Sequence, residues 1–250
     1  MPMPDAGAVQ RERARRRFGA RTLLAFTAVL ILAVPFSLLV VLVTAKSDPV
    51  LRLDHYTADS LHGFAVDHSS FTAAMKMISR LGSSTGWWIV LTPVFFWLAW
   101  RRLPRLAAFL AVTALGSSLL NTLVKTLVDR ARPHLLDPVA AAAGKSFPSG
   151  HTQSATVGCG ILLLIFFPVV ARRARAWLFV AAAAIVVLIG FSRIALGVHY
   201  LSDVIGGVVI GVAWLLAMTA AFSAWRRDER KPPVHPTEGL EPEQRDRLTP

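Results

Sequence analysis

The sequence contains a single cysteine and few charged residues. The one cysteine, Cys159, excludes an internal disulfide and a cysteine-based metal cage. Charged residues make up 17% of the chain, whereas an average soluble domain has about 25%. Hydrophobic residues make up 54% of the 250 residues, which excludes intrinsic disorder over most of the chain. The composition is therefore unlike that of a water-soluble protein, and Cys159, which lies in an apolar run, is expected to be buried.

Apolar runs long enough to cross a bilayer occur six times. A helix needs about 20 residues to span about 30 Å of hydrocarbon. The six runs cover approximately residues 22–45, 82–100, 106–128, 152–170, 176–194 and 200–225. Pro93 interrupts the second run, but membrane helices tolerate proline where neighbouring groups satisfy the backbone. The sequence therefore predicts an all-α fold, a bundle of six transmembrane helices in one membrane domain of residues 22–225.

Polar segments flank this domain at both ends. Residues 1–21 form a basic segment, and the apolar run that follows is longer than the 7–15 residues of a signal peptide. We therefore expect a retained first helix, with cleavage after Ala45 as the alternative. Residues 226–250 are rich in Pro, Glu and Arg and lack apolar periodicity, so they are predicted to be a disordered tail.

The positive charges predict how the helices are oriented. Arginines gather in the connections after the second and fourth runs, in the N-terminal segment and after the last run. Short loops rich in Lys and Arg stay in the cytoplasm, so both termini should be cytoplasmic and the protein should lie in the plasma membrane. The net charge of +12 is thereby explained by topology and by contact with anionic lipids, and no nucleic-acid partner is needed.

The first outer loop, residues 46–81, should hold one or two amphipathic helices. Apolar residues recur at approximately helical spacing between residues 54 and 80, as in helices that lie along a membrane interface. The same loop carries His55, His62 and His68 near acidic residues, which allows a metal site. Spacings of seven and six residues do not bring three ligands together on one helix, so solvated interface helices are expected instead.

Ionisable residues near membrane spans are costly and therefore mark functional sites. They fall into three clusters, within residues 125–133, 147–151 and 192–203. In the six-helix arrangement all three clusters lie at the outer face. Asp129 and Arg130 are interpreted as surface residues outside the site, and His134 as a minor candidate for substrate contact.

The cations and one helix start suit a phosphate group. Lys125, Arg132 and Arg193 supply positive charge, and arginine presents a planar fork to phosphate oxygens. Ser149 and Gly150 precede a helix whose first backbone N–H groups are unpaired, so they can face an anion. Ser149 is also expected to be the N-cap. The alternatives are residues whose charged ends reach the membrane surface and a simple helix cap.

Two histidines complete the chemistry. His199 and Asp203 are four residues apart and share a helix face if the sixth helix begins near Val198. A carboxylate on one imidazole nitrogen leaves the other free to act as a nucleophile. His151 could protonate a leaving oxygen, a step worth about 10²–10⁴ in rate. A structural hydrogen bond between helices is the alternative for His199 and Asp203.

The three clusters resemble the motifs K-x6-R-P, P-S-G-H and S-R-x5-H-x3-D of the type 2 phosphatidic acid phosphatase and vanadium haloperoxidase superfamily. The match is complete at the motif positions from Lys125 to Asp203. The resemblance implies His199 as the nucleophile, Asp203 as its partner and His151 as the general acid. It implies that the phosphate is bound by a further set of residues: Lys125, Arg132, Ser149, Gly150 and Arg193.

The resemblance further implies an integral membrane lipid phosphatase that needs no metal or cofactor and whose site faces away from the cytoplasm. Its substrate would be a lipid phosphomonoester or pyrophosphate, such as phosphatidic acid, phosphatidylglycerophosphate, diacylglycerol pyrophosphate or an isoprenyl pyrophosphate. The Ala- and Arg-rich composition looks bacterial, which favours the isoprenyl carrier undecaprenyl pyrophosphate. The alternatives are a lipid phosphotransferase, a vanadate-dependent haloperoxidase and a non-catalytic protein that binds or transports lipids.

Overall fold

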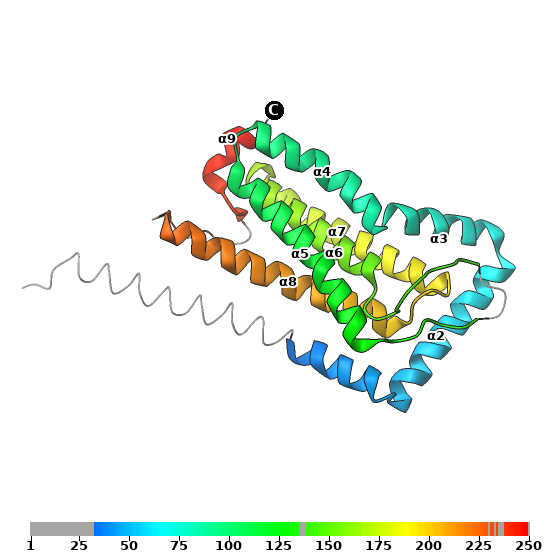
Figure 1. Ribbon diagram of the computed structural model, residues 1–250. Coiled ribbons are helices and arrows are strands. Elements are labelled where there is room, and N and C mark those ends of the chain that lie inside the picture. The colour runs from blue at the N-terminus through cyan, green and yellow to red at the C-terminus, as the bar shows by residue number, and fades with distance from the viewer. Residues whose placement is uncertain (1–32, 136–138, 230, 233, 235–237, 250) are drawn as a thin grey trace, which may run out of the picture.

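The computed structural model describes residues 33–135, 139–229, 231–232, 234 and 238–249. Within these residues the chain is helical and has no strand. A helix at Ala33–Thr44 is followed by α2 (Asp48–Asp67), α3 (Ser69–Leu81), α4 (Ser84–Trp100) and α5 (Pro104–Val128). Then come α6 (Gly150–Phe166), the 3₁₀ turn η1 (Phe167–Val169), α7 (Arg172–Ala195) and α8 (Leu201–Asp228). Figure 1 shows α4 to α8 as a bundle of long helices. The predicted all-α fold is confirmed.

Four helices are long and apolar enough to cross a membrane by themselves. These are α5, α6 extended by η1, α7 and α8. Two bent pairs bring the number to six if each is one span: Ala33–Thr44 with α2, bent by 85°, and α3 with α4, bent by 43°. Trp177, Leu127 and Leu119 expose more than 70% of their surface, as is expected of side chains that face lipid. The part of the first predicted span before residue 33 lies outside the described residues.

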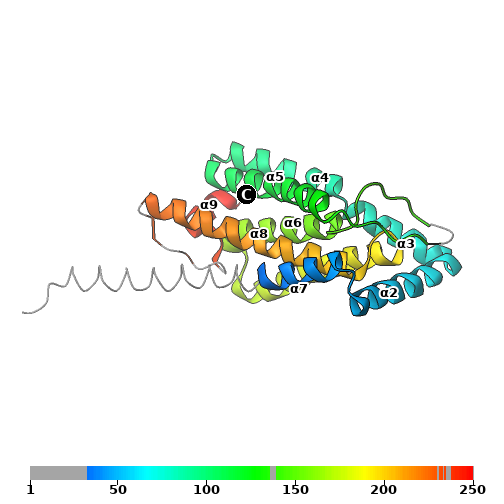
Figure 2. The same ribbon diagram turned by 60° about the horizontal axis from the view of Figure 1, so that its bottom comes forward.

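Helix α6 lies at the centre of the bundle and packs against α5, α7 and α8. Its contact with α8 is close because α8 presents small residues. A Cβ atom on Gly207 would lie only 2.7 Å from the carbonyl oxygen of Ser149, so a larger residue there would push α8 away. Cys159 lies on α6, and it is buried and free, as predicted. Figure 2 shows the Ala33–Thr44 helix alongside α8, where the rings of Phe36 and Phe147 have centroids 6.0 Å apart.

Helices α2 and α3 lie across one end of the bundle (Figure 1). Each has one buried face, and in α2 this face includes Asp54, Ala58 and His62. The expected amphipathic helices are therefore present. The expectation that their polar side chains are solvated is wrong for Asp54 and His62, which are 1% and 6% exposed because α2 packs on α7 and α8. Among the described residues, no group of three or more His, Cys, Asp and Glu could hold a metal ion.

The C-terminal segment folds back on the opposite end of the bundle. The turn η3 (Pro242–Gln244) and the short helix α9 (Arg245–Leu248) follow residues 238–241, and Leu240 and Leu248 are buried. The prediction of a disordered tail is therefore wrong for residues 238–249, and α8 itself extends to Asp228. Charge explains the docking, because the buried Glu241 carboxylate lies 3.0 Å from Nε of Arg105.

Candidate active site

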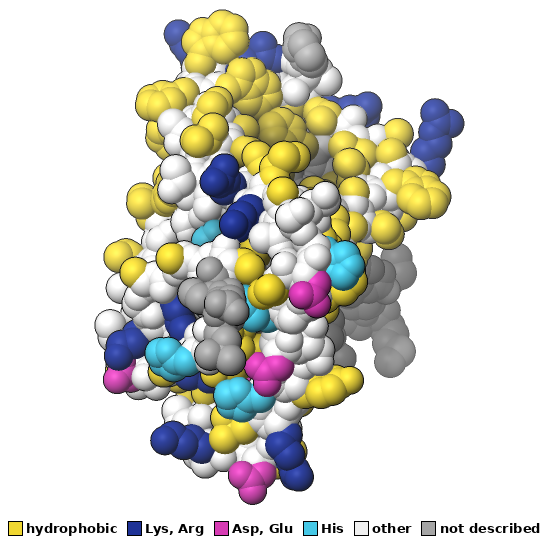
Figure 3. All heavy atoms as spheres, turned by 90° about the vertical axis from the view of Figure 1, so that its right-hand side faces the viewer, with side chains coloured by type: hydrophobic (Ala, Val, Ile, Leu, Met, Phe, Trp, Pro, Cys, Tyr) yellow, Lys and Arg dark blue, Asp and Glu magenta, His cyan; other side chains and the backbone are white. Residues whose placement is uncertain are grey.

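The predicted site residues gather at the end of the bundle that α2 and α3 cover. Lys125 lies in the last turn of α5, Arg193 in the last turn of α7, and Asp203 in the first turn of α8. Ser149 immediately precedes α6, and His199 lies in the connection between α7 and α8. Figure 3 looks onto this end of the molecule, where histidine, acidic and basic side chains are concentrated. The structure thus brings together residues from four helix ends.

His199 and Asp203 form the predicted contact, but not on one helical face. Helix α8 begins at Leu201, so His199 precedes it. Its Nδ1 nevertheless lies 3.3 Å from Oδ2 of Asp203. The same carboxylate oxygen accepts a 2.9 Å hydrogen bond from the backbone N–H of Tyr200, which fixes Asp203 as the cap of α8. Both side chains are almost fully buried, at 2% and 0% exposed. The pair is therefore held rigidly by the start of the helix.

Arg132 determines which nitrogen of His199 carries the proton. Its Nη1 lies 3.1 Å from Nε2 of His199 and donates to the carbonyl oxygen of Val198 at 2.7 Å. A guanidinium group only donates hydrogen bonds, so Nε2 must present its lone pair and Nδ1 must carry the proton that Asp203 accepts. Burial lowers the pKa of His199 to about 4, although the hydrogen bond to Asp203 acts in the opposite direction. The imidazole is therefore neutral at neutral pH, with the lone pair of Nε2 facing the cations.

Three cations gather in this region without a carboxylate of their own. In the described part of the chain, Lys125, Arg132 and Arg193 form no ion pair with Asp or Glu. Lys125 donates instead to the carbonyl oxygen of Lys145 at 2.7 Å, and Arg132 to those of Ala143 and Gly144, both at 3.0 Å. Nearby positive charges without counter-ions are unfavourable unless an anion joins them. The arrangement is suited to a phosphate group.

The start of α6 faces the same region. Ser149 is the N-cap residue by position, but its side chain caps no backbone N–H, and its oxygen accepts a 3.0 Å hydrogen bond from Thr152. Its backbone N–H donates to the carbonyl oxygen of Asp203 at 2.9 Å, which joins α6 to α8. A Cβ atom on Gly150 would lie 3.2 Å from the amide oxygen of Asn121, so the absence of a side chain allows close approach there. The predicted position of the cap is confirmed and its hydrogen bond is not.

His151 lies in the first turn of α6, near the proposed nucleophile and the three cations. The groups that act on it are Arg193, His199, Arg132 and Lys125. The side chain is partly exposed, unlike that of His199, so it can meet a substrate that enters the site. The minor candidate His134 is exposed beyond the end of α5.

Three residues near His199 and Asp203 were missed in the sequence. The interpretation of Arg130 as a surface residue is wrong, because its side chain is 10% exposed and pairs with Asp203 at 2.7 Å and with Asp54 at 2.6 Å. Burial acts to lower its pKa, but the two carboxylates raise it above the ordinary value. Ser146 is fully buried and donates to Asp203. Its place directly before Phe147 was the available signal, whereas nothing local in the sequence marks Asp54.

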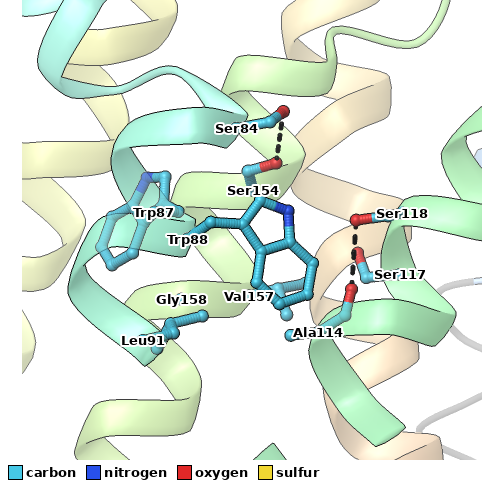
Figure 4. Close-up of a pocket in the computed structure, with 10 residues that line it drawn as sticks. All are labelled: Ser84, Trp87, Trp88, Leu91, Ala114, Ser117, Ser118, Ser154, Val157 and Gly158. Atoms are coloured by element: carbon cyan, nitrogen blue, oxygen red, sulfur yellow. Dashed lines mark hydrogen bonds between the residues drawn. The ribbon is translucent and has the colours of Figure 1, made fainter. Parts of the chain in front are cut away.

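A small pocket lies beside the polar interior, between α4, α5 and α6 (Figure 4). It is lined by both aromatic and serine side chains, among them Trp87, Trp88, Ser117 and Ser154. Gln153 connects Ser117 with Asn121: it donates to the Ser117 side chain at 2.9 Å and accepts from the Asn121 amide at 2.8 Å. A chain of polar side chains therefore runs from beside Gly150 to the pocket wall.

The chain is similar to known proteins in the region that contains the site. A family model described as the PAP2 superfamily matches residues 105–227. The resemblance indicated by the three motifs is thereby confirmed, since the match includes every residue of the candidate site.

Curated relatives are similar over the same part of the chain. Phosphatidylglycerophosphatase B of Bacillus subtilis is 35% identical over 99 residues, 38% of this chain and 47% of that protein. Lipid A 1-phosphatase of Rhizobium etli is 38% identical over 128 residues, 48% of this chain and 51% of that protein. The aligned part thus spans about half the length of each relative. Undecaprenyl-diphosphatase of Sulfolobus acidocaldarius is 27% identical over 59% of this chain and 68% of that protein.

A solved structure shows the same fold. The crystal structure of a transmembrane PAP2-type phosphatidylglycerolphosphate phosphatase from Bacillus subtilis matches with a TM-score of 0.68. The match covers 83% of this chain and 98% of that chain at 22% sequence identity. At this identity the likeness concerns the fold, and it confirms a transmembrane helical bundle.

Proposed function

Residues 105–227 match the PAP2 superfamily, and we propose that this protein is an integral membrane lipid phosphatase that acts through a phosphohistidine. The observation that carries the proposal is the unprotonated Nε2 of His199 among three cations without carboxylate partners. Lys125, Arg132 and Arg193, together with Ser149 and Gly150, would hold the phosphate. Asp203 would orient His199.

The reaction would proceed in two displacements at phosphorus. Nε2 of His199 attacks, a P–N bond forms, and the P–O bond to the lipid breaks while His151 gives a proton to the leaving oxygen. A water molecule then attacks the phosphohistidine and gives a proton to His151. The P–N bond breaks, and inorganic phosphate and neutral His199 are released. The cations stabilise the charge that builds on the phosphoryl oxygens in both steps.

The substrate would be a lipid with a terminal phosphate or pyrophosphate. The helices around the site expose apolar side chains to lipid, so a lipid tail can remain in the bilayer while its headgroup reaches the site. The relatives act on phosphatidylglycerophosphate, lipid A and undecaprenyl diphosphate by name, and all three are lipid phosphates. Among the candidates we favour an isoprenyl pyrophosphate, with phosphatidic acid and phosphatidylglycerophosphate next.

The site would face away from the cytoplasm, in the plasma membrane. Arg101 and Arg102 follow α4, and Arg105 lies in the first turn of α5. Arg172 begins α7, and Arg226 lies in the last turn of α8. All are at the end of the bundle opposite His199, and this concentration of arginine supports the proposal that the end is cytoplasmic. We accordingly retain the division into a basic segment of residues 1–21 and a membrane domain of residues 22–225, with both termini cytoplasmic.

Cysteine labelling tests this orientation. The native Cys159 is buried, so a new cysteine can be read selectively. In intact cells that express the protein, an impermeant maleimide should label Asp59→Cys on α2 and should leave Arg102→Cys unlabelled until the cells are permeabilised. The reverse pattern would place the site at the cytoplasmic face.

The activity is tested by release of phosphate from purified protein in detergent with EDTA present, over a panel of lipid phosphates and pyrophosphates. We expect release by the wild type, loss of release in His199→Ala, and full release in His68→Ala, whose side chain is exposed between α2 and α3. The order of preference within the panel identifies the substrate. No release from any lipid by folded protein would contradict the proposal and favour a transferase or a non-catalytic lipid-binding protein.

A further inference from the structure

A buried ionic network connects α2 to the pair formed by His199 and Asp203. Nη1 of Arg130 lies 2.7 Å from Oδ1 of Asp203 and 2.6 Å from the hydroxyl of Ser202. Nη2 of the same guanidinium lies 2.6 Å from Oδ2 of Asp54. Arg130 therefore bridges two carboxylates, one on the first turn of α8 and one on α2.

The network leaves little freedom to any of its members. Asp54 is 1% exposed, and its other oxygen accepts a 2.9 Å hydrogen bond from the backbone N–H of Ser202. The guanidinium carbon of Arg130 lies 4.3 Å from the centre of the Tyr200 ring, a cation–π distance. The backbone oxygen of Arg130 accepts from the N–H of Ser146, which in turn donates its hydroxyl proton to Asp203. Arg130 thus fixes the positions of three segments relative to one another: the segment after α5, the start of α8, and α2.

We propose that Arg130 and Asp54 are positioning residues for the nucleophile, with Arg130 holding the Asp203 carboxylate in place and Asp54 holding Arg130. The proposal rests on the proposed function, because it concerns how His199 is prepared for attack. It makes α2 part of the catalytic apparatus through Asp54, although α2 contributes no residue that contacts the phosphate. Arg130 lies in the first cluster but at none of the motif positions, and Asp54 lies outside all three clusters.

The charge balance explains why two carboxylates are present for one cation. Asp203 must keep enough negative charge to accept the Nδ1 proton of His199, yet too much would hold His199 in its protonated, non-nucleophilic form. Arg130 neutralises part of the Asp203 charge, and Asp54 takes up part of the Arg130 charge. Replacement of Arg130 by a neutral residue should therefore favour protonation of His199. The other charged groups that face His199 are Arg132, Arg193 and His151, and they are unchanged by such a substitution.

The test compares Arg130→Met and Arg130→Lys with the control Asp129→Asn. Asp129 is the adjacent residue, but its side chain is 63% exposed and pairs with an exposed lysine, so the control should have wild-type kinetics. Arg130→Met keeps much of the side-chain volume and loses the charge. We expect kcat to fall about 10- to 100-fold with KM within about threefold of the wild type, the usual size of effects on groups that orient an active-site residue. Arg130→Lys keeps the charge and can reach only one carboxylate at a time, so an intermediate kcat is expected.

The pH dependence separates positioning from simple damage to the fold. At low pH kcat should fall as His199 becomes protonated, and we call this fall the acid limb of the pH profile. In Arg130→Met the acid limb should lie at higher pH than in the wild type. In Arg130→Lys and Asp54→Asn it should lie at the same pH as in the wild type or at lower pH. The same lipid is used throughout, so its own ionisation is common to all variants. In a variant that was only destabilised, kcat would be lower at every pH, and the acid limb would lie at the same pH as in the wild type.

Folding is followed in parallel by thermal unfolding in detergent. If Arg130→Met does not fold because Asp54 is left buried and unpaired, the double variant Arg130→Met/Asp54→Asn removes both charges and carries the same expectation for the acid limb. If the wild type releases phosphate and the folded Arg130 variants have the same kcat and the same pH dependence as the wild type, this inference is overturned and the proposed function stands. Absence of release by the wild type would instead overturn the proposed function.

Discussion

Nη1 of Arg132 lies 3.1 Å from Nε2 of His199, so a positively charged donor lies in front of the nitrogen that would attack phosphorus. The contact orders the protonation of the imidazole before substrate is present, because the guanidinium can only donate. A phosphate that enters can take over the Arg132 donors and leave the Nε2 lone pair directed at phosphorus. One residue would therefore serve both to prepare the nucleophile and to bind the group that it attacks.

The protonation of His199 can be followed directly. Burial lowers the pKa of His199 to about 4, so the imidazole should remain neutral as pH falls from 7 to about 5 and should charge only below that. An ordinary histidine charges near pH 6.5. We expect ¹⁵N NMR of histidine-labelled protein in detergent, assigned with His199→Ala, to show this late titration. A midpoint between pH 6 and 7 would show that the charged form is not disfavoured in the site.

Arg193 is expected to contribute to the reaction rather than to the fold. It is 8% exposed and donates to the hydroxyl of Ser79 on α3. Loss of one donor to a developing oxyanion typically costs about 10²–10³ in rate, so Arg193→Ala should reduce phosphate release by that factor. Arg173→Ala, an exposed position near the other end of α7, is the matched control and should retain full activity. Equal turnover in both variants would remove Arg193 from the phosphate site.

Two glycines should respond to alanine with opposite signs. A Cβ atom on Gly158 of α6 would lie 2.1 Å from the ring of Trp87, so Gly158→Ala must displace α4 or its tryptophan, at a cost of about 1–3 kcal/mol. Gly63 is exposed on α2 with nothing within 4 Å, so Gly63→Ala should stabilise the protein by about 0.5–1 kcal/mol. Thermal unfolding in detergent measures both effects. A Gly158→Ala variant as stable as the wild type would show that α4 does not pack on α6 as described.

The docked C-terminal segment should depend on Glu241. Its carboxylate lies 3.0 Å from Nε of Arg105 and 3.9 Å from Nη1 of Arg226, and both arginines are buried. Arg105 and Arg226 keep Glu229 and Glu243 as partners when Glu241 is removed. Loss of a contact to a charged group costs about 1.5–3 kcal/mol, so Glu241→Ala should loosen the segment and speed tryptic cleavage after Arg245 and Arg247 by about 10-fold or more. The exposed Glu238→Ala is the control and should be cleaved at the wild-type rate. Equal protection of both variants would refute this role of Glu241.

The apolar runs were sufficient to predict a helical bundle, and the sequence motifs selected residues that the structure brings together. Each motif lies at a helix end, where polar groups are near the membrane surface and cost less free energy than at the bilayer centre. The residues within each motif are also close in sequence, so a local pattern can identify them. The condition for a shared helix face, a sixth helix that begins near Val198, is not met, because the Asp203 carboxylate accepts from the backbone N–H of the N-cap residue Tyr200 and His199 lies outside the helix. Asp203 still contacts His199, but across the turn that precedes α8 and not along one helix face.

The remaining features depend on contacts between distant segments, which no local pattern reports. Arg130 was interpreted as a surface residue together with Asp129, yet its partners are Asp54 and Asp203, which are 76 and 73 residues away. The C-terminal segment is polar in composition, and only its docking against Arg105 and the buried Leu240 gives it structure. Charge pairs of this kind become visible only when the helices are placed in space.

The central claim, a phosphohistidine at His199, is tested most directly by trapping the phosphorylated protein. Purified protein in EDTA is mixed with a lipid phosphate that carries a ³²P label, quenched within milliseconds by alkali and denaturant, and separated from lipid. We expect the wild-type protein to carry label that survives alkali and is lost in acid, as a P–N bond requires. We expect no label on His199→Ala. Rapid release of phosphate without label on the protein at any time, or label that persists in His199→Ala, would contradict it.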